Sequence, residues 1–190
     1  MYIGFFYVEK ASMTELEKIY KIYLNCNQNI CIDSRSNTIK KSIFFGIKGK
    51  NFDGNMFIDD ALSKGAKFAI SDNQKHLNSK KIIYVEDSLK TLQELAKIHR
   101  KKLSIPIIAI TGTNGKTTTK ELINHLLKST FSTYSTKGNF NNHIGVPLSL
   151  LSIKHTHQFG IIELGANHMG EIKFLCSLAR PTHGIITNIG

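Results

Sequence analysis

The sequence predicts an α/β protein with two parts, a small mixed α/β domain over residues 1–104 and part of a doubly wound parallel-sheet domain over residues 105–190. Three observations predict this fold class. Strand and helix patterns alternate along the second part, as they do in parallel sheets. An isoleucine-rich apolar run at 107–110 passes through a glycine turn into a helical pattern. Ser104-Ile105-Pro106 marks the boundary, because proline restrains the residue before it and cannot continue a helix.

The first part shows helix and strand patterns in turn. Ser12-Met13-Thr14-Glu15 is expected to form a capping box that opens a helix, and apolar residues then recur at helical spacing from Leu16 to Leu24. Strands are expected at 30–33, 42–47, 67–71 and 81–85, with a helix at 56–64. A longer helix at 88–102 ends this part, with His99 as a partly buried residue on its apolar side. The apolar residues 1–8 are expected to form a short strand or an extension.

The second part alternates more regularly. Strands are expected at 105–111, 131–135, 159–163 and 184–188, and helices at 117–129, 146–151 and 170–179. This alternation is typical of a parallel, doubly wound sheet. The chain stops directly after a strand pattern, which suggests a cut through a domain.

Composition limits the classes of protein. The chain has 190 residues, 41% of them hydrophobic, which is enough for a core, and no run approaches the ~20 apolar residues of a membrane span. The start lacks a basic leader, so we expect a cytoplasmic protein. Cys26, Cys31 and Cys176 form no CxxC pair and are expected to be reduced thiols. The His155-Thr156-His157 stretch is expected to be solvated surface rather than a metal site.

The net charge of +11 indicates anionic partners. Most of the excess is scattered lysine, with no arginine cluster and no interleaving of aromatic and basic residues. A nucleic-acid-binding module is therefore not favoured, and a surface suited to small anionic substrates explains the charge at least as well.

The strand-to-helix segment at 107–119 has the order that a phosphate-binding loop requires. Glycines let successive backbone N–H groups form a nest for anionic oxygens, and the following helix adds its positive end. The loop is a short form, because Ile110 stands where the longer pattern has its first glycine. Lys116 is expected to contact the terminal phosphates of a nucleoside triphosphate, and the Thr117 hydroxyl is expected to be a ligand of Mg²⁺. The expected nucleotide-binding residues are Gly112, Thr113, Asn114, Gly115, Lys116, Thr117 and Thr118.

Glu163 ends a strand at the carboxyl edge of the predicted sheet, where open α/β folds bind ligands. It could hold Mg²⁺ directly or through water, opposite Thr117, although a solvated acid at a strand end is the alternative. The loop 135–143 is rich in asparagine, whose amide both donates and accepts hydrogen bonds. Asparagine and glycine are also common turn residues, so a structural role remains open for this loop. In the first part, Arg35 could hold a diphosphate with two parallel hydrogen bonds.

Several strings together resemble the Mur ligase family. They are Asp33-Ser34-Arg35, Phe44-Phe45, Lys48-Gly49, Phe52-Asp53-Gly54, Gly112 to Thr118, Lys137 to Asn142, Ile144 to Leu148, Glu163 to His168, Gly170-Glu171-Ile172 and Pro181 to Gly184. The resemblance covers about residues 30–190 and implies an ATP-dependent amide ligase of peptidoglycan precursor synthesis. Within the family, these strings are most similar to the branch that adds D-alanyl-D-alanine to UDP-N-acetylmuramoyl-tripeptide.

The resemblance implies that the bound nucleotide is ATP, and it implies roles for particular residues. Lys116 and Glu163 would be catalytic, and Thr117 and Glu163 would hold Mg²⁺. The nucleotide-sugar peptide would be bound by Ser34, Arg35, Lys48, Asp53, Thr136, Asn139, Asn141 and Asn142. Residues 1–104 would then bind the UDP-sugar, and residues 105–190 would be the first part of the ATP-binding domain.

The family continues past the last strand of this chain, so the resemblance implies that this chain alone is catalytically incomplete and that the full-length enzyme is a monomer. Two alternatives remain open. One is the related ligase that adds the third peptide residue, and the other is a nucleotide-binding module without ligase activity.

Overall fold

The computed structural model describes residues 13–76 and 79–189. In the first half, the helices are α1 (Glu15–Asn25), α2 (Ile58–Ser63) and α3 (Ser88–Lys102), with short 3-10 turns η1 (Gly54–Phe57) and η2 (Gln74–His76). Its strands are β1 (Ile30–Cys31), β2 (Ile43–Phe45), β3 (Lys48–Gly49), β4 (Phe52–Asp53), β5 (Phe68–Ser71) and β6 (Ile82–Tyr84). The strand or extension expected at residues 1–8 lies outside the described residues.

The first sheet is parallel, in the order β1-β2-β5-β6, and a separate antiparallel hairpin joins β3 to β4. Successive residues of β2 point to opposite faces, as the pleat of a strand requires. Phe44 packs on the side of α2, whereas Ile43 and Phe45 belong to the cluster that contains α1 and α3 side chains. Both faces are thus covered by helices, which explains why this strand is apolar throughout.

The capping box of α1 differs from the predicted one. Thr14 is the N-cap residue, its hydroxyl accepts the backbone N–H of Glu17, and the Glu17 carboxylate accepts the backbone N–H of Thr14. The predicted box placed Glu15 in the role that Glu17 holds, so it began two residues too early. The sequence contains two overlapping S/T-x-x-E patterns, and the pattern alone does not rank them.

The second half contains a four-stranded parallel sheet in the order β10-β7-β9-β8. Its strands are β7 (Ile107–Thr111), β8 (Thr133–Ser135), β9 (Phe159–Glu163) and β10 (His183–Ile186), and its helices are α4 (Lys116–Leu127), α5 (Gly145–Ser152) and α6 (Glu171–Ala179). Helix α4 contacts β7, β8 and β9, whereas α5 and α6 lie on the other face together with α3. The predicted doubly wound arrangement is confirmed.

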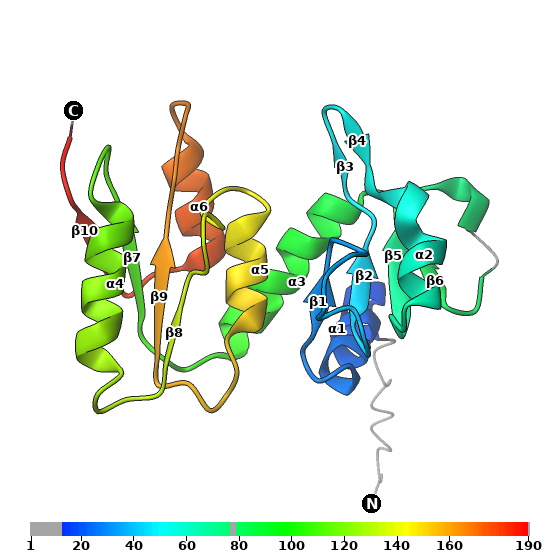
Figure 1. The fold of residues 1–190 in the computed structure, drawn as a ribbon, viewed down its shortest axis with the longest axis horizontal. Coiled ribbons are helices and arrows are strands. Elements are labelled where there is room, and N and C mark those ends of the chain that lie inside the picture. The colour runs from blue at the N-terminus through cyan, green and yellow to red at the C-terminus, as the bar shows by residue number, and fades with distance from the viewer. Residues whose placement is uncertain (1–12, 77–78, 190) are drawn as a thin grey trace, which may run out of the picture.

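Helix α3 lies between the two sheets (Figure 1) and contacts α1, α5 and α6. One apolar cluster accordingly includes Tyr23 from α1, Leu92 from α3 and Leu150 from α5. His99 of α3 is fully buried within this junction, more deeply than the sequence predicts. Its Nε2 atom lies 2.7 Å from the carbonyl oxygen of Ile153, and its Nδ1 atom lies 3.0 Å from the hydroxyl of Tyr20. No helix in the described part of the chain has the length and apolar character that crossing a membrane requires.

Candidate functional site

The predicted phosphate-binding loop connects β7 to α4. Gly112 has a φ of +135° and Gly115 a φ of +79°, conformations that side-chain-bearing residues rarely adopt. A Cβ atom at position 112 would also collide with the Thr187 hydroxyl, which lies after β10. The two glycines let the chain turn sharply from the strand into the helix, so that the first N–H groups of α4 face the loop.

The loop is held in place by the residues that follow β10. The backbone N–H of Thr187 donates to the carbonyl oxygen of Thr111 at 2.9 Å. The backbone N–H of Asn114 donates to Oδ1 of Asn188 at 2.8 Å, and that of Thr113 donates to the carbonyl oxygen of Asn188 at 3.3 Å. Sequence reasoning gave Asn188 no role, because its contact with the loop depends on the pairing of β10 with β7.

Lys116 is the first residue of α4, and its side chain bends over the loop. Its ammonium donates to the carbonyl oxygens of Gly112 at 2.7 Å and Thr113 at 3.2 Å. A lysine that spans the loop in this way is near the position where terminal phosphates would lie. Its contact with phosphate remains a prediction, as do those of Thr118 and the other loop residues.

Glu163 and Thr117 lie together at the carboxyl edge of the sheet. The Thr117 hydroxyl donates to Oε2 of Glu163 at 2.9 Å, and the side-chain amide of Asn141 donates to Oε1 at 2.9 Å. The Glu163 residue is only 2% exposed, so the alternative of a solvated acid is wrong. A hydroxyl and a carboxylate side by side are the oxygen ligands that Mg²⁺ prefers, and the residues therefore fit that ion.

A buried lysine in the same cluster was missed by sequence reasoning. Lys120, in the second turn of α4, is 1% exposed, and its Nζ atom lies 3.8 Å from Oε2 of Glu163. Its Nζ atom also donates to the carbonyl oxygen of Thr136 at 2.8 Å and lies 3.1 Å from Oε1 of Glu121. In the sequence Lys120 follows three threonines and precedes a glutamate, and such polar neighbours indicate an exposed position on a helix.

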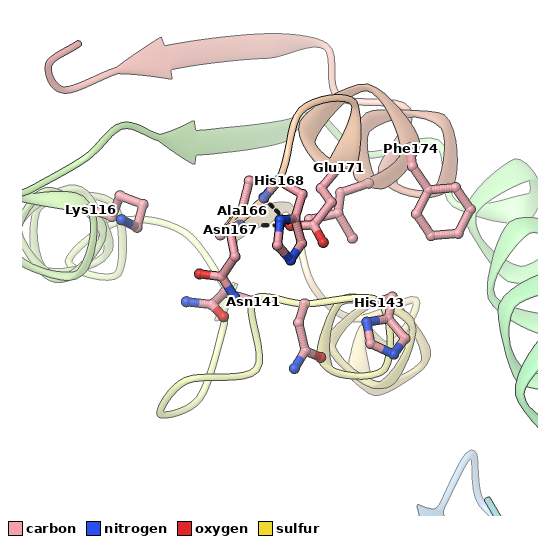
Figure 2. Close-up of a pocket in the computed structure, with 11 residues that line it drawn as sticks. Lys116, Asn141, His143, Ala166, Asn167, His168, Glu171 and Phe174 are labelled. Carbon is pink, nitrogen blue, oxygen red and sulfur yellow. Dashed lines mark hydrogen bonds between the residues drawn. The ribbon is translucent and has the colours of Figure 1, made fainter. Parts of the chain in front are cut away.

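A pocket of about 340 Å³ opens beside Lys116, as Figure 2 shows. Asn141 and His143 line one side, and the loop after β9 with the start of α6 lines the other, where Asn167 and His168 lie. The Glu171 carboxylate accepts the backbone N–H groups of Asn167 and His168 at 2.7 and 3.2 Å. These two hydrogen bonds lower the pKa of Glu171 and fix the loop against α6. The pocket can therefore hold a polar ligand close to the phosphate loop.

The other substrate-binding residues predicted in the loop after β8 differ in their burial and contacts. Thr136 is buried, and its hydroxyl accepts the backbone N–H of Glu163 at 3.0 Å, so it positions the carboxylate rather than facing a substrate. The Asn142 side-chain oxygen accepts the backbone N–H groups of Ile144 and Gly145, at the start of α5, and Asn142 also lines the pocket. Asn139 is exposed in the same loop.

The predicted substrate residues of the first half fall into two groups. Ser34 and Arg35 line a second pocket of about 340 Å³, together with the rings of Phe52 and Phe57, which stack with centroids 5.1 Å apart. The Arg35 guanidinium forms two hydrogen bonds with Asp33, at 2.9 and 3.0 Å.

Lys48 and Asp53 are not among the residues that line this second pocket. Lys48 lies 3.7 Å from a carboxylate oxygen of Asp72, and Asp53 accepts the backbone N–H and the side-chain amide of Asn55. Asp72 follows β5 and Asn55 lies in η1, so both predicted residues contact side chains of the first half outside this second pocket.

A parallel sheet, a glycine loop that leads into a helix, and a carboxylate facing the first threonine of that helix define a P-loop α/β protein. Comparison with known protein families identifies the family within this class. The model of the Mur ligase family catalytic domain matches residues 28–109, and the model of the Mur ligase middle domain matches residues 110–190. The chain belongs to the Mur ligase family.

Two curated relatives with the same name show the similarity. The chain is 39% identical over 181 residues to the UDP-N-acetylmuramoyl-tripeptide–D-alanyl-D-alanine ligase of Synechocystis, covering 94% of this chain and 38% of that protein. It is 37% identical to the ligase of the same name from Haemophilus influenzae, covering 95% of this chain and 41% of that protein. The chain therefore spans about two fifths of the length of these curated relatives.

Solved structures agree with this result. The MurF ligase of Thermotoga maritima in complex with ADP superposes with a TM-score of 0.75 at 34% identity, covering 94% of this chain and 39% of that one. MurF of Acinetobacter baumannii superposes with a TM-score of 0.76 at 35% identity, covering 85% of this chain and 35% of that one. The predicted fold and the resemblance to the family are confirmed.

Proposed function

We propose that this chain supplies the UDP-sugar-binding and phosphate-binding parts of an ATP-dependent ligase that adds D-alanyl-D-alanine to UDP-N-acetylmuramoyl-tripeptide. The observation that carries the proposal is the contact of Thr117 with Glu163, 2.9 Å long, beside the pocket that Lys116 lines. The names of the relatives favour this branch over the ligase that adds the third peptide residue. We propose that residues 1–104 bind the UDP-sugar and that residues 105–190 begin the ATP-binding domain.

The reaction proceeds in two steps. An oxygen of the tripeptide carboxylate attacks the γ-phosphorus of ATP, the bond to the β,γ-bridging oxygen breaks, and an acyl phosphate and ADP form. The amine of D-alanyl-D-alanine then attacks the acyl carbon, and inorganic phosphate leaves as the amine loses a proton. Lys116 turns from the loop carbonyls to the transferring phosphoryl group, where its charge offsets the developing negative charge.

Thr117 and Glu163 are the residues that would hold Mg²⁺, and the ion would supply positive charge to the phosphate oxygens. When Thr117 offers an oxygen lone pair to the metal, its hydroxyl hydrogen can still point at Glu163, as it does in the structure. Asn141 holds the other carboxylate oxygen, so the orientation of Glu163 is fixed from both sides. This arrangement reduces the reorganisation that binding would require.

The second pocket suits the uridine end of the nucleotide sugar. Phe52 and Phe57 are exposed aromatic rings, and a planar base can pack against such rings. Arg35 and Ser34 lie beside them, where a guanidinium can hold a diphosphate. An adjoining groove shares Asp33 with this pocket and reaches Lys137 and Phe140, in the loop that also carries Asn141. The substrate would follow this path, with Asn139, Asn141 and Asn142 orienting its peptide end.

ATP and nucleotide-linked sugars are cytoplasmic metabolites, so we propose that the full-length enzyme acts in the cytoplasm, as a monomer and without nucleic acid. A nucleotide-binding module that lacks ligase activity is the other function this fold could support, and no feature of the described site favours it.

Isothermal titration of the chain with ATP in the presence of Mg²⁺, and separately with UDP-N-acetylmuramoyl-tripeptide, tests the proposal. We expect both to bind, and Glu163→Gln to weaken Mg²⁺-dependent ATP binding without affecting the nucleotide sugar. Binding of ATP without the sugar nucleotide would favour the nucleotide-binding module. Failure of both ligands to bind would remove the proposed function.

A further inference from the structure

Lys120 is a buried ammonium for which the proposed reaction has no use. Its side chain is 1% exposed, and transfer of a charge out of water is costly unless the charge is paired. Its three contacts reach different parts of the site: Glu163 at the end of β9, the Thr136 carbonyl oxygen after β8, and Glu121 on α4 itself. The side chain therefore ties the helix of the phosphate loop to the residues that orient the carboxylate.

The two carboxylates beside Lys120 differ in burial. The Glu121 side chain is 60% exposed, so water screens its attraction for the ammonium, whereas the Glu163 side chain is 3% exposed. Lys120 is thus the buried positive charge that balances the buried negative charge of Glu163. Both oxygens of Glu163 are engaged by hydrogen-bond donors from Thr117 and Asn141 as well.

A divalent cation has few protein ligands at this position. Across residues 13–76 and 79–189, no group of three or more His, Cys, Asp or Glu side chains could hold a metal ion. Thr117 and Glu163 supply oxygens, and Mg²⁺ commonly completes its shell with substrate phosphates and water. A cation arriving without a nucleotide would meet a carboxylate whose charge is already offset by Lys120.

We propose that Lys120 is a positioning residue that acts as the built-in counter-ion of Glu163, so that a divalent cation binds this site only together with nucleotide phosphates. The inference rests on the proposed metal and nucleotide site. Nucleotide phosphates bring negative charge and additional oxygen ligands, and these outweigh the repulsion between Lys120 and the metal. Lys120 consequently couples the entry of the cation to the entry of the nucleotide.

Binding of Mn²⁺ without nucleotide, followed by electron paramagnetic resonance of the free ion, tests this directly. We expect wild type to bind Mn²⁺ only weakly and without dependence on Glu163, and Lys120→Met to bind it at least about tenfold more tightly, because the repulsion has been removed. Lys120→Gln should show the same gain while keeping a hydrogen-bond donor for the Thr136 carbonyl oxygen. Lys128→Met, on the exposed end of the same helix, makes the same change in net charge and should gain nothing.

Equal Mn²⁺ binding by the Lys120 and Lys128 variants would overturn the proposal. Wild type tests the proposal even if the Lys120 variants do not fold. If wild type binds Mn²⁺ without nucleotide and Glu163→Gln abolishes that binding, the proposal is also overturned. The proposed function fails by a different result, namely the absence of ATP binding to wild type in the presence of Mg²⁺. A gain of Mn²⁺ binding in Lys120→Met would still stand in that case.

Discussion

Arg100 Nε donates to the carbonyl oxygen of Ala179 at 2.8 Å, across 79 residues of chain. The same guanidinium donates to the carbonyl oxygens of Arg180 at 3.0 Å and Leu103 at 2.9 Å. Arg100 is 7% exposed, and burial lowers the pKa of its guanidinium, although arginine remains charged at any ordinary pH. One side chain thus satisfies the C-terminal carbonyls of α6 from the end of α3, and it links the two halves of the chain.

Arg100→Met is expected to lower the free energy of unfolding by roughly 2–4 kcal/mol, because it leaves several buried carbonyl oxygens without donors. Because methionine fills most of the space of the arginine side chain, the loss of stability measures the lost hydrogen bonds rather than the effect of a cavity. Urea unfolding followed by circular dichroism measures it. Lys101→Met, on the exposed side of the same turn, serves as the control and should change stability by less than about 0.5 kcal/mol. Equal effects of the two variants would contradict the linking role of Arg100.

His99 makes stability depend on pH. The Ile153 carbonyl oxygen can only accept, so Nε2 carries the hydrogen and Nδ1 accepts the Tyr20 hydroxyl. Burial lowers the pKa of His99 below its ordinary value of 6.5, and the folded protein therefore holds a neutral imidazole. The unfolded chain binds the extra proton as pH falls below about 6.5, so this contribution to stability is present above that pH and is lost below it.

We expect the free energy of unfolding to fall between pH 7.5 and pH 5.5, by up to about 1.4 kcal/mol per pH unit from His99. His99→Gln keeps a hydrogen-bonding side chain but removes the titration, so its pH dependence should be shallower than that of wild type. Unfolding by urea at each pH gives the slopes. A slope for His99→Gln that matches wild type would refute the role of His99.

The sequence was a good guide to elements and a poor guide to contacts that depend on strand order. The helix and strand periods predicted the helices and the strands of both parallel sheets but missed the hairpin strands β3 and β4, and the glycine loop predicted where β7 meets α4. A shared site for Thr117 and Glu163 was expected as well, because Thr117 begins the helix after a strand and Glu163 ends a strand at the carboxyl edge of a parallel sheet. Local pattern and sheet geometry are enough for such features.

The burial of Lys120 could not be predicted, because it arises where α4 crosses β8 and β9. Thr136 illustrates the same limit: the sequence places it in a polar loop, but pairing of β8 with β9 turns its hydroxyl toward the backbone of Glu163. Asn188 reaches the phosphate loop only because β10 pairs with β7. Each of these roles depends on which strands are neighbours, and strand order is not encoded in local periodicity.

Gly112→Ala is expected to destabilise the protein by roughly 1–3 kcal/mol, because a φ of +135° and the close Thr187 hydroxyl both oppose a Cβ atom. Gly138→Ala is a matched control. Gly138 also has a positive φ, +54°, but among the described residues beyond its chain neighbours no atom lies within 4 Å of the place where its Cβ atom would be. Thermal unfolding should show the larger shift for Gly112→Ala, and ATP binding should weaken only in that variant. A larger shift for Gly138→Ala than for Gly112→Ala would mean that the Thr187 side chain can move away from the new Cβ atom without loss of stability.

Phe57→Ala is expected to weaken binding of UDP by about tenfold, since ring stacking contributes roughly 1–1.5 kcal/mol beyond buried area. The loss of the stacked partner should also release Phe52, which is 56% exposed. Met56→Ala removes the neighbouring side chain, which is 76% exposed and does not line the pocket, and it should leave the affinity unchanged. Calorimetric titration with UDP compares the two. Equal affinities for both variants would place the uridine elsewhere.

Lys116→Ala is expected to reduce the affinity for ATP by roughly 30- to 150-fold, because a hydrogen bond to a charged group contributes about 2–3 kcal/mol. In the structure its ammonium is held by the Gly112 and Thr113 carbonyl oxygens, so nucleotide must exchange those contacts for phosphate. The affinity for AMP, which lacks the terminal phosphates, should therefore hardly change. Lys101→Ala provides the control for net charge. An unchanged affinity for ATP in Lys116→Ala would show that this lysine does not bind the phosphates.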